Sequence, residues 1–289
     1  MARFTRDRFV DILTTDHATQ TESTGAHDLG KALQRTLLKI EQELRWTSDE
    51  EKRTDSMSEG YDCSGTTAVV CLVTPSHFIV ANLGDSRAVL MTRSSECLAL
   101  SHDHKPANDV ESKRVKAAGG YLSIDGGTPY IHHFPTRSLS PSISVSRALG
   151  DFIFKANEDK GPMEQMVIPD ADVTITERSS NHQFLVLACD GLWDVVSNDA
   201  VASSIQQVMS DGATHSCDDI AQGLVNEAIT SGSRDNVTVV VSILPLPVVP
   251  SSPSENKTIA ATQKEAAAAT QEKSDEQEEK SDEQEEKSD

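Results

Sequence analysis

A mostly apolar segment that ends in two carboxylates constrains the fold of this 289-residue chain more than any other feature. Residues 184–189 read Phe-Leu-Val-Leu-Ala-Cys, which is typical of a strand buried on both faces. Asp190 and Gly191 follow at once, and Asp194 comes shortly after them. A carboxylate at the end of a buried strand is unfavourable unless it is paired or binds a cation. The segment fits either a polar turn in which Asp194 caps the next helix, or a site for a hard cation such as Mg²⁺ or Mn²⁺.

Composition argues against several classes of partner. The formal net charge of −20 disfavours binding to nucleic acid or to an anionic membrane surface. No apolar run approaches the roughly 20 residues that span a bilayer, and the N-terminus lacks the apolar core of a signal peptide. Five scattered cysteines without a C-x-x-C pair fit a reducing compartment. We therefore expect a cytoplasmic or nuclear monomer without nucleic-acid or membrane partners.

The character of the chain changes near residue 245. Four prolines between residues 245 and 253 end regular structure, and a seven-residue repeat that begins at Lys273 follows them. The repeat has no apolar seam, which argues against a coiled coil, and its acidic composition predicts disorder. We predict one folded domain over residues 1–245 and a disordered acidic tail over 246–289, which could contact a basic partner.

Hydrophobic periodicity predicts both helices and paired strands. Apolar residues at helical spacing predict a helix over roughly 27–46, and two apolar runs around Thr-Pro-Ser predict a hairpin of residues 66–73 and 77–83. The same patterns predict further strands at 88–91, 97–100, 173–176, 184–188 and 237–243, and further helices around 108–118, 201–209 and 220–228.

Helix caps and the loop region can also be predicted. Asn108 is expected to cap its helix with Glu111 as capping-box partner, and Asp218 is expected to cap the helix after it. Residues 121–170, rich in Gly, Pro and Ser, are expected to be irregular and functional. Because strands and helices do not alternate regularly, we expect an α+β fold of antiparallel sheets with helices packed outside.

Four short acidic motifs lie at expected strand ends or turns. They contain Asp85, Asp103, the Asp190–Asp194 pair, and Asp235 immediately before the last apolar strand. The chain has no G-x-S-x-G elbow, no P-loop and no C-x₅-R loop. Without a candidate covalent nucleophile, hydrolysis by a metal-activated water is the favoured chemistry.

Seven motifs in one order resemble the metal-dependent protein phosphatase family, the PP2C-type serine/threonine phosphatases. They cover roughly residues 60–243 and are Cys63–Ala68, Ala81–Arg87, Asp103–Pro106, Glu111 with Arg114 before Ala118–Gly120, Ser144–Asp151, Asp190–Asp194 and Asp235–Thr238. The resemblance implies two stacked antiparallel sheets flanked by helices, a four-layer αββα sandwich. It also implies phosphoprotein substrates, whose phosphoserine and phosphothreonine are hydrolysed by a water between two Mg²⁺ or Mn²⁺ ions.

The resemblance also implies roles for individual residues. Asp190 and Asp235 match ligands of the catalytic metal pair. Asp103 and Asp194, together with Asp190, match a third and weaker metal site.

A supporting group is assigned structural roles in preference to direct catalysis. Its members are Asp85, Arg87, Arg147, Asp151 and Asn236. Buried contacts of Asp with Arg or backbone would explain most of them. His102 and His104 are interpreted as surface or hydrogen-bonded histidines in preference to ligands or acids.

The chain also departs from the family pattern. It lacks the Asp-Gly-His-Gly-Gly motif, whose Asp bridges the two metals in the family, and the preceding Arg and Glu-Asp pair. Residues 1–10 resemble the helix that follows that motif, so we expect an N-terminally incomplete sandwich and impaired activity. A truncated gene model is the favoured explanation over a short isoform or a non-catalytic relative. The alternative functions are a catalytically silent phosphatase-like binding module and a simple cation-binding domain.

Overall fold

A computed structural model describes residues 1–20, 25–54, 64–132, 141–210 and 215–246. The chain divides into two units, Met1–Pro247 and Val248–Asp289. The predicted acidic tail lies outside the described residues. Within the described ranges, no helix is both long and apolar enough to cross a membrane.

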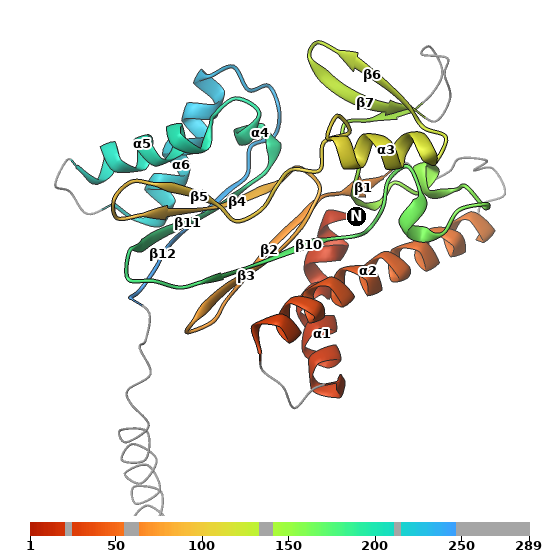
Figure 1. Ribbon diagram of the computed structural model, residues 1–289, viewed down its shortest axis with the longest axis horizontal. Helices are drawn as coiled ribbons and strands as arrows, with labels where there is room; N and C mark the ends of the chain where they lie inside the picture. The colour runs from red at the N-terminus through yellow and green to blue at the C-terminus, as the bar shows by residue number, and fades with distance from the viewer. Residues whose placement is uncertain (21–24, 55–63, 133–140, 211–214, 247–289) are drawn as a thin grey trace, which may run out of the picture. The chain divides into compact units, whose positions relative to one another are not determined.

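The first main layer pair combines two N-terminal helices with a three-stranded sheet (Figure 1). The helices are α1 (Ala2–Gln20) and α2 (Ala26–Thr54). The antiparallel sheet has the order β10-β3-β2, with β10 at Asp172–Glu177, β3 at His77–Leu83 and β2 at Ala68–Val73. The predicted hairpin is therefore confirmed.

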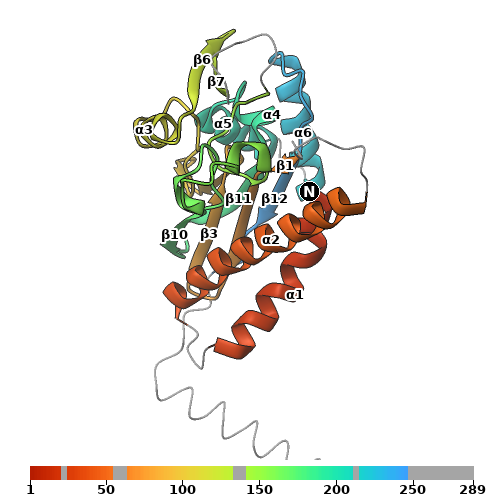
Figure 2. The same cartoon turned by 90° about the vertical axis from the view of Figure 1, so that its right-hand side faces the viewer.

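The second layer pair combines a four-stranded sheet with two C-terminal helices. The sheet order is β12-β11-β4-β5, with β12 at Val239–Ile243, β11 at His182–Ala188, β4 at Arg87–Thr92 and β5 at Cys97–Ala99. The helices are α5 (Asn198–Met209) and α6 (Cys217–Thr230). Figure 2 shows α1 and α2 on the side of the sheets that faces away from α5 and α6.

Alternating side chains explain why the two sheets stack. In β3, Phe78 and Val80 pack between the two sheets. The intervening residues Ile79 and Ala81 pack against the first helix pair. In β11, Leu185 lies between the sheets and Val186 faces the second helix pair. Successive side chains of a strand point to opposite faces, so a strand between two layers is buried on both faces. The predicted four-layer αββα sandwich is confirmed.

A smaller subdomain covers one end of the sandwich. It contains α3 (Asp109–Ala117) and the antiparallel sheet β6-β7-β8, at Tyr121–Asp125, Thr128–His132 and Ser142–Ile143. After β8, β9 (Leu149–Gly150) pairs with the distant β1 (Gly65–Thr66) in a two-stranded sheet. The 3-10 helices η1 (Phe152–Lys155) and η2 (Pro162–Glu164) follow β9 in the chain.

The structure corrects the prediction that residues 121–170 are irregular. Strands β6 and β7 form a hairpin whose turn contains Gly126 and Gly127, with φ of 56° and 92°. A two-residue Gly-Gly turn suits a tight hairpin because glycine adopts positive φ without strain.

The predicted helix caps are also corrected. Asn108 does stand at the N-cap position of α3, but its side chain makes no cap hydrogen bond, and Glu111 pairs with arginines instead of completing a capping box. The cap of α6 is Ser216, not Asp218, and Ser197 caps α5, so Asp194 does not cap that helix. Serine hydroxyls reach the free N–H groups of the first turn as well as carboxylates do.

Candidate metal centre

Strand pairing brings the acidic motifs together at one end of the second sheet. Ala188, the last residue of β11, pairs with Arg87 at the start of β4 and with Val239 at the start of β12. The short helix α4 (Asp190–Trp193), which directly follows β11, therefore lies beside the segments that precede β4 and β12. Those three segments carry Asp190, Asp85 and Asp235.

The Lys105 ammonium lies among these carboxylates. Its Nζ donates to Asp85 Oδ2 at 2.6 Å and to Asp194 Oδ1 at 3.2 Å. Asp85 is only 2% exposed, and burial raises the pKa of its carboxyl group, with Lys105 opposing the rise. The ammonium thus compensates a buried negative charge that would otherwise be unfavourable.

Asp190 is partly buried beside the other carboxylates of the group. The pKa of Asp190 is raised to about 6, chiefly by burial and also by the negative charges of Asp85, Asp194 and Asp235, while Lys105 opposes the rise. Like charges at short range disfavour ionisation of each member. These four carboxylates, Asp85, Asp190, Asp194 and Asp235, are called the acidic cluster below.

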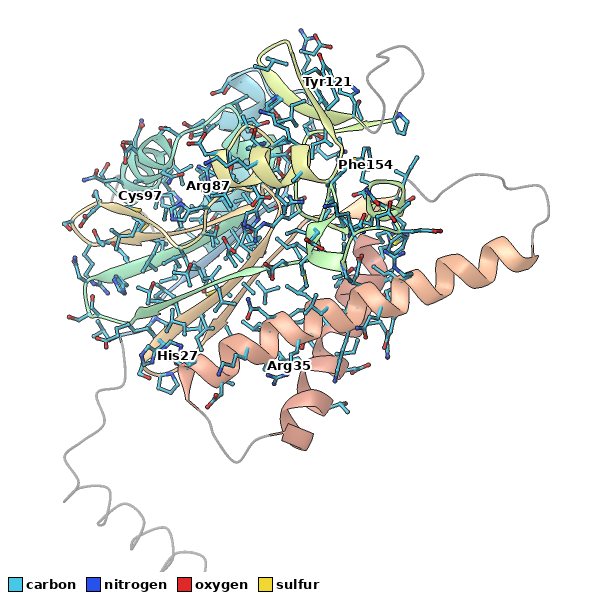
Figure 3. The ribbon with its side chains drawn as sticks, turned by 45° about the vertical axis from the view of Figure 1, so that its right-hand side comes forward. His27, Arg35, Arg87, Cys97, Tyr121 and Phe154 are labelled. Carbon is cyan, nitrogen blue, oxygen red and sulfur yellow. The ribbon has the colours of Figure 1, made fainter. Side chains whose placement is uncertain are left out.

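Asp103 is brought to the same end of the sheet but is clasped by Arg87, which is labelled in Figure 3. Arg87 Nε and Nη2 donate to the two oxygens of Asp103 at 2.8 Å each. Arg87 also donates to Asn198 Oδ1 and lies 5.1 Å from the centre of the Trp193 ring. The predicted third-site ligand is therefore held by a guanidinium in this structure.

Gly191 allows α4 and the loop that carries Asp235 to approach each other closely. A Cβ at this position would collide with the carbonyl oxygen of Asn236. Ser233 Oγ donates to the Gly191 carbonyl at 2.7 Å, and the Asn236 N–H donates to Asp235 Oδ1 at 2.6 Å. Backbone contacts, including that of Asn236, therefore set the spacing of Asp190 and Asp235.

Arg147 belongs to a separate buried network. Arg147 and Arg114 donate to opposite oxygens of Glu111, each at 2.7 Å, and Ser146 Oγ donates to Glu111 as well. Burial alone would raise the pKa of Glu111, but these hydrogen bonds outweigh it and lower that pKa to about 2. Arg147 also donates to Asp172 at 2.9 Å. The network joins α3 to the strands of the sandwich.

Asp151 is positioned by backbone conformation. It has a φ of 51°, in the left-handed region, and its N–H donates to the Ser64 carbonyl at 2.8 Å. Its carboxylate occupies the space that a Cβ at Gly65 would need. These contacts link the segment after β9 to the start of β1, and Cys63 lies outside the described residues.

His104 is a buried, doubly hydrogen-bonded histidine. The Gly84 N–H donates to its Nδ1 at 3.0 Å, which places the proton on Nε2, 3.1 Å from Asp172 Oδ2. The carbonyl of His102 accepts a hydrogen bond from Asn82. Neither contact involves the acidic cluster.

The donor chemistry of the acidic cluster fits a hard divalent cation. Carboxylate oxygens are the ligands that Mg²⁺ and Mn²⁺ prefer, and a cation would relieve the repulsion that raises the pKa of Asp190. However, the described part of the chain holds no group of three or more His, Cys, Asp or Glu side chains arranged to hold an ion. The residues present therefore supply suitable donors, two of which contact the Lys105 ammonium.

The central position of Lys105 was missed by the sequence analysis. Lys105 stands in the motif Asp103–Pro106, in which only Asp103 was expected to have a role. Lys105 is the basic residue of one of the four acidic motifs, and this is the signal that could have identified its role. Clustered carboxylates need a compensating positive charge.

A largely apolar cavity of about 340 Å³ opens beside the acidic cluster. Its walls come from α1, β2, β11 and β12, and its lining includes Phe9, Thr67, Ser86, Cys189 and Thr238. Cys189 and Ser86 are the direct neighbours of Asp190 and Asp85 in the chain.

Comparison with known sequences identifies the class of protein to which this fold and its acidic site belong. A sequence model of the family Protein phosphatase 2C matches residues 5–237. The chain belongs to the protein phosphatase 2C family, which confirms the resemblance found in its motifs.

Particular relatives are found among mammalian phosphatases. Protein phosphatase 1B of Mus musculus is 37% identical over 204 residues, which cover 71% of this chain and 47% of that protein. Protein phosphatase 1A of Homo sapiens is 33% identical over 238 residues, which cover 80% of this chain and 56% of that protein. The chain thus spans about half the length of these relatives.

Solved structures show the same fold. The serine-threonine phosphatase 2C from Toxoplasma gondii superposes with a TM-score of 0.67 at 21% identity, covering 84% of this chain and 80% of that one. A sex determining protein of C. elegans superposes with a TM-score of 0.66 at 23% identity, covering 84% of this chain and 53% of that one.

Proposed function

We propose that this chain carries the catalytic carboxylates of a protein serine/threonine phosphatase that uses Mg²⁺ or Mn²⁺. The observation that carries the proposal is the convergence of Asp190, Asp194 and Asp235 at the end of β11, where mutual repulsion contributes to the raised pKa of Asp190. Membership in the protein phosphatase 2C family supports the reaction class. Phosphoproteins are the proposed substrates.

In this proposal Asp190 and Asp235 hold the catalytic cations, while Asp194 and Asp103 contribute to a weaker third position. Bound divalent cations would supply an activated water and charge stabilisation for phosphoryl transfer. Gly191 and the backbone of Asn236 fix the spacing of the ligands, and the Lys105 ammonium pairs with the buried Asp85 carboxyl group. Arg87 orients Asp103.

A catalytically silent phosphopeptide-binding module is the second candidate. It is supported by the absence, within the described residues, of an arranged group of three ligands. The 289 residues also contain no Asp-Gly-His-Gly-Gly motif. For this reason we expect slow turnover by this chain even if its carboxylates bind metal.

Phosphate release from a phosphothreonine peptide, measured with and without Mn²⁺, separates the two candidates. The phosphatase proposal expects slow Mn²⁺-dependent release that EDTA and Asp190→Asn both abolish. Saturable peptide binding without any release above that of Asp190→Asn would favour the silent module. Asp125→Asn, on the distant β6–β7 hairpin, is the matched control and should behave like the wild type.

The remaining properties are proposals of the same kind. We propose a cytoplasmic or nuclear monomer, whose acidic C-terminal repeat is available to a basic partner. Sedimentation of the purified chain tests the monomer, and a salt-dependent interaction that is lost on deletion of residues 272–289 would support the tail contact.

A further inference from the structure

The acidic cluster contains its own cation. The Lys105 ammonium bridges Asp85, at 2.6 Å, and Asp194, at 3.2 Å. Lys105 also opposes the rise in the pKa of Asp190, so its charge acts on a third carboxylate. One flexible side chain therefore supplies positive charge where the proposed function places a metal ion.

We propose that Lys105 is a positioning residue that competes with the divalent cation for Asp194. Loading of the cation releases the ammonium from Asp194, while the ammonium stays on Asp85. The inference rests on the proposed function, because it assumes that Asp194 lies within the metal centre.

The two contacts of Lys105 differ in a way that favours this exchange. The side chain of Asp85 is 3% exposed, whereas that of Asp194 is 54% exposed. A buried carboxylate depends on its partner, because losing it leaves an uncompensated charge. An exposed ion pair is screened by water and contributes little. The longer contact with Asp194 is thus the one that a competing cation can break.

The backbone around Lys105 restricts the exchange to the side chain. The His104 N–H donates to the Gly84 carbonyl at 3.0 Å, and the Ser146 N–H donates to the His104 carbonyl at 3.0 Å. His104 is 4% exposed. Because this segment between β5 and α3 is held by backbone hydrogen bonds, the ammonium can move between carboxylates without rearrangement of the chain.

Competition and simple structural support predict different results for Lys105→Met. Removal of the ammonium leaves buried Asp85 without its partner, so the metal-free protein should melt at a lower temperature. The same change makes the acidic cluster more negative and frees Asp194, so Mn²⁺ should bind about tenfold more tightly. A residue that only organises the ligands would weaken both properties together.

The experiment is a calorimetric Mn²⁺ titration of the wild type, Lys105→Met and the control Lys116→Met. Lys116 is exposed on α3, and its loss should leave Mn²⁺ affinity unchanged. Melting temperatures in EDTA and in saturating Mn²⁺ give the second readout. We expect Mn²⁺ to raise the melting temperature of Lys105→Met more than that of the wild type.

The double variant Lys105→Met/Asp85→Asn keeps the inference testable if Lys105→Met folds poorly. It removes the buried charge together with its partner, so the metal-free stability should recover. Because Asp194 is still free of the ammonium, its Mn²⁺ affinity should remain at or above that of the wild type. Mn²⁺ binding weaker than that of the wild type in both Lys105 variants would overturn the inference.

The failure of the inference can be distinguished from failure of the proposed function. Equal Mn²⁺ affinity of the wild type and Lys105→Met overturns the competition and leaves the phosphatase proposal standing. Tighter binding by Lys105→Met, without phosphate release by the wild type, supports the competition and contradicts catalysis. If neither protein binds Mn²⁺ at millimolar concentration, both the inference and the metal-dependent function are wrong.

Discussion

Arg87 binds both carboxylate oxygens of Asp103, with two nitrogen–oxygen distances of 2.8 Å. Their side chains are 21% and 14% exposed, so the pair is largely withdrawn from water. A two-pronged contact of this kind fixes orientation as well as charge. The contact ties the start of β4 to the loop after β5. Both segments lie beside the acidic cluster.

Replacement of Arg87 tests this clasp. Arg87→Ala should lower the free energy of unfolding by about 2 kcal/mol, because Asp103 is left partly buried without a partner. Arg87→Lys should recover only part of the loss, since lysine cannot make the two-pronged contact. Urea denaturation measures both variants. Arg6→Ala removes an exposed ion pair and should change stability little, and an equally small effect at Arg87 would contradict the clasp.

Gly191→Ala tests the close approach of α4 and the loop that carries Asp235. The added Cβ would collide with the Asn236 carbonyl, so we expect a loss of about 1–3 kcal/mol in unfolding free energy. Mn²⁺ binding should weaken too, because Asp190 and Asp235 would move apart. Gly223→Ala is the matched control.

At Gly223, in α6, a Cβ meets nothing within 4 Å. Alanine there should stabilise the helix by about 1 kcal/mol. Denaturant unfolding and a Mn²⁺ titration compare the two alanine variants. Unaltered stability of Gly191→Ala would show that α4 and this loop are not in tight contact.

Asp190 predicts a pH dependence of the metal-free protein. Its pKa is raised from 3.8 to about 6, so the folded state binds more protons than the unfolded state between these values. The linkage relation then makes the Asp190 contribution to stability fall as pH rises from about 4 to 6. Asp190→Asn removes this contribution.

The measurement is urea denaturation in EDTA at several pH values. The stability of Asp190→Asn relative to the wild type should increase as pH rises from about 4 to 7. Asp199→Asn, at the start of α5, is a carboxylate control. A constant difference between Asp190→Asn and the wild type across this range would refute the predicted repulsion.

Glu111 predicts the opposite pH dependence. Its pKa is lowered from 4.5 to about 2 in the folded protein, so its contribution to stability is fully present above pH 4.5 and is lost as pH falls toward 2. Glu111→Gln should cost about 3 kcal/mol at neutral pH, because Arg114 and Arg147 lose their charged partner.

Thermal or urea unfolding at pH 7 and at pH 3 tests this prediction. The difference between Glu111→Gln and the wild type should shrink at the lower pH. Glu96→Gln, at an exposed position, should leave stability within about 0.5 kcal/mol of the wild type. A similar small change for Glu111→Gln would contradict its place in the buried network.

Local patterns predicted much of the sandwich. The apolar runs around Phe78 and Leu185 alternate between layers, and strand periodicity was sufficient to find them. The β6–β7 hairpin was missed because its Gly-Gly turn was counted as loop composition and not as turn chemistry. Asn108 was placed correctly at the start of α3, whereas Asp218 was mistaken for the cap of α6 because Asp and Ser are nearly equivalent as caps.

The sequence by itself determined the layered α+β fold and the family, because these depend on residue type and short-range spacing, and it predicted Asp190 and Asp235 as metal ligands. Only the tertiary structure decided which charges meet. Lys105 reaches Asp85 and Asp194, and Arg87 reaches Asp103, because β11 pairs with both β4 and β12. That long-range pairing places segments from residue 85 to residue 235 at one sheet end, and no local pattern along the chain specifies which side chain then neutralises which.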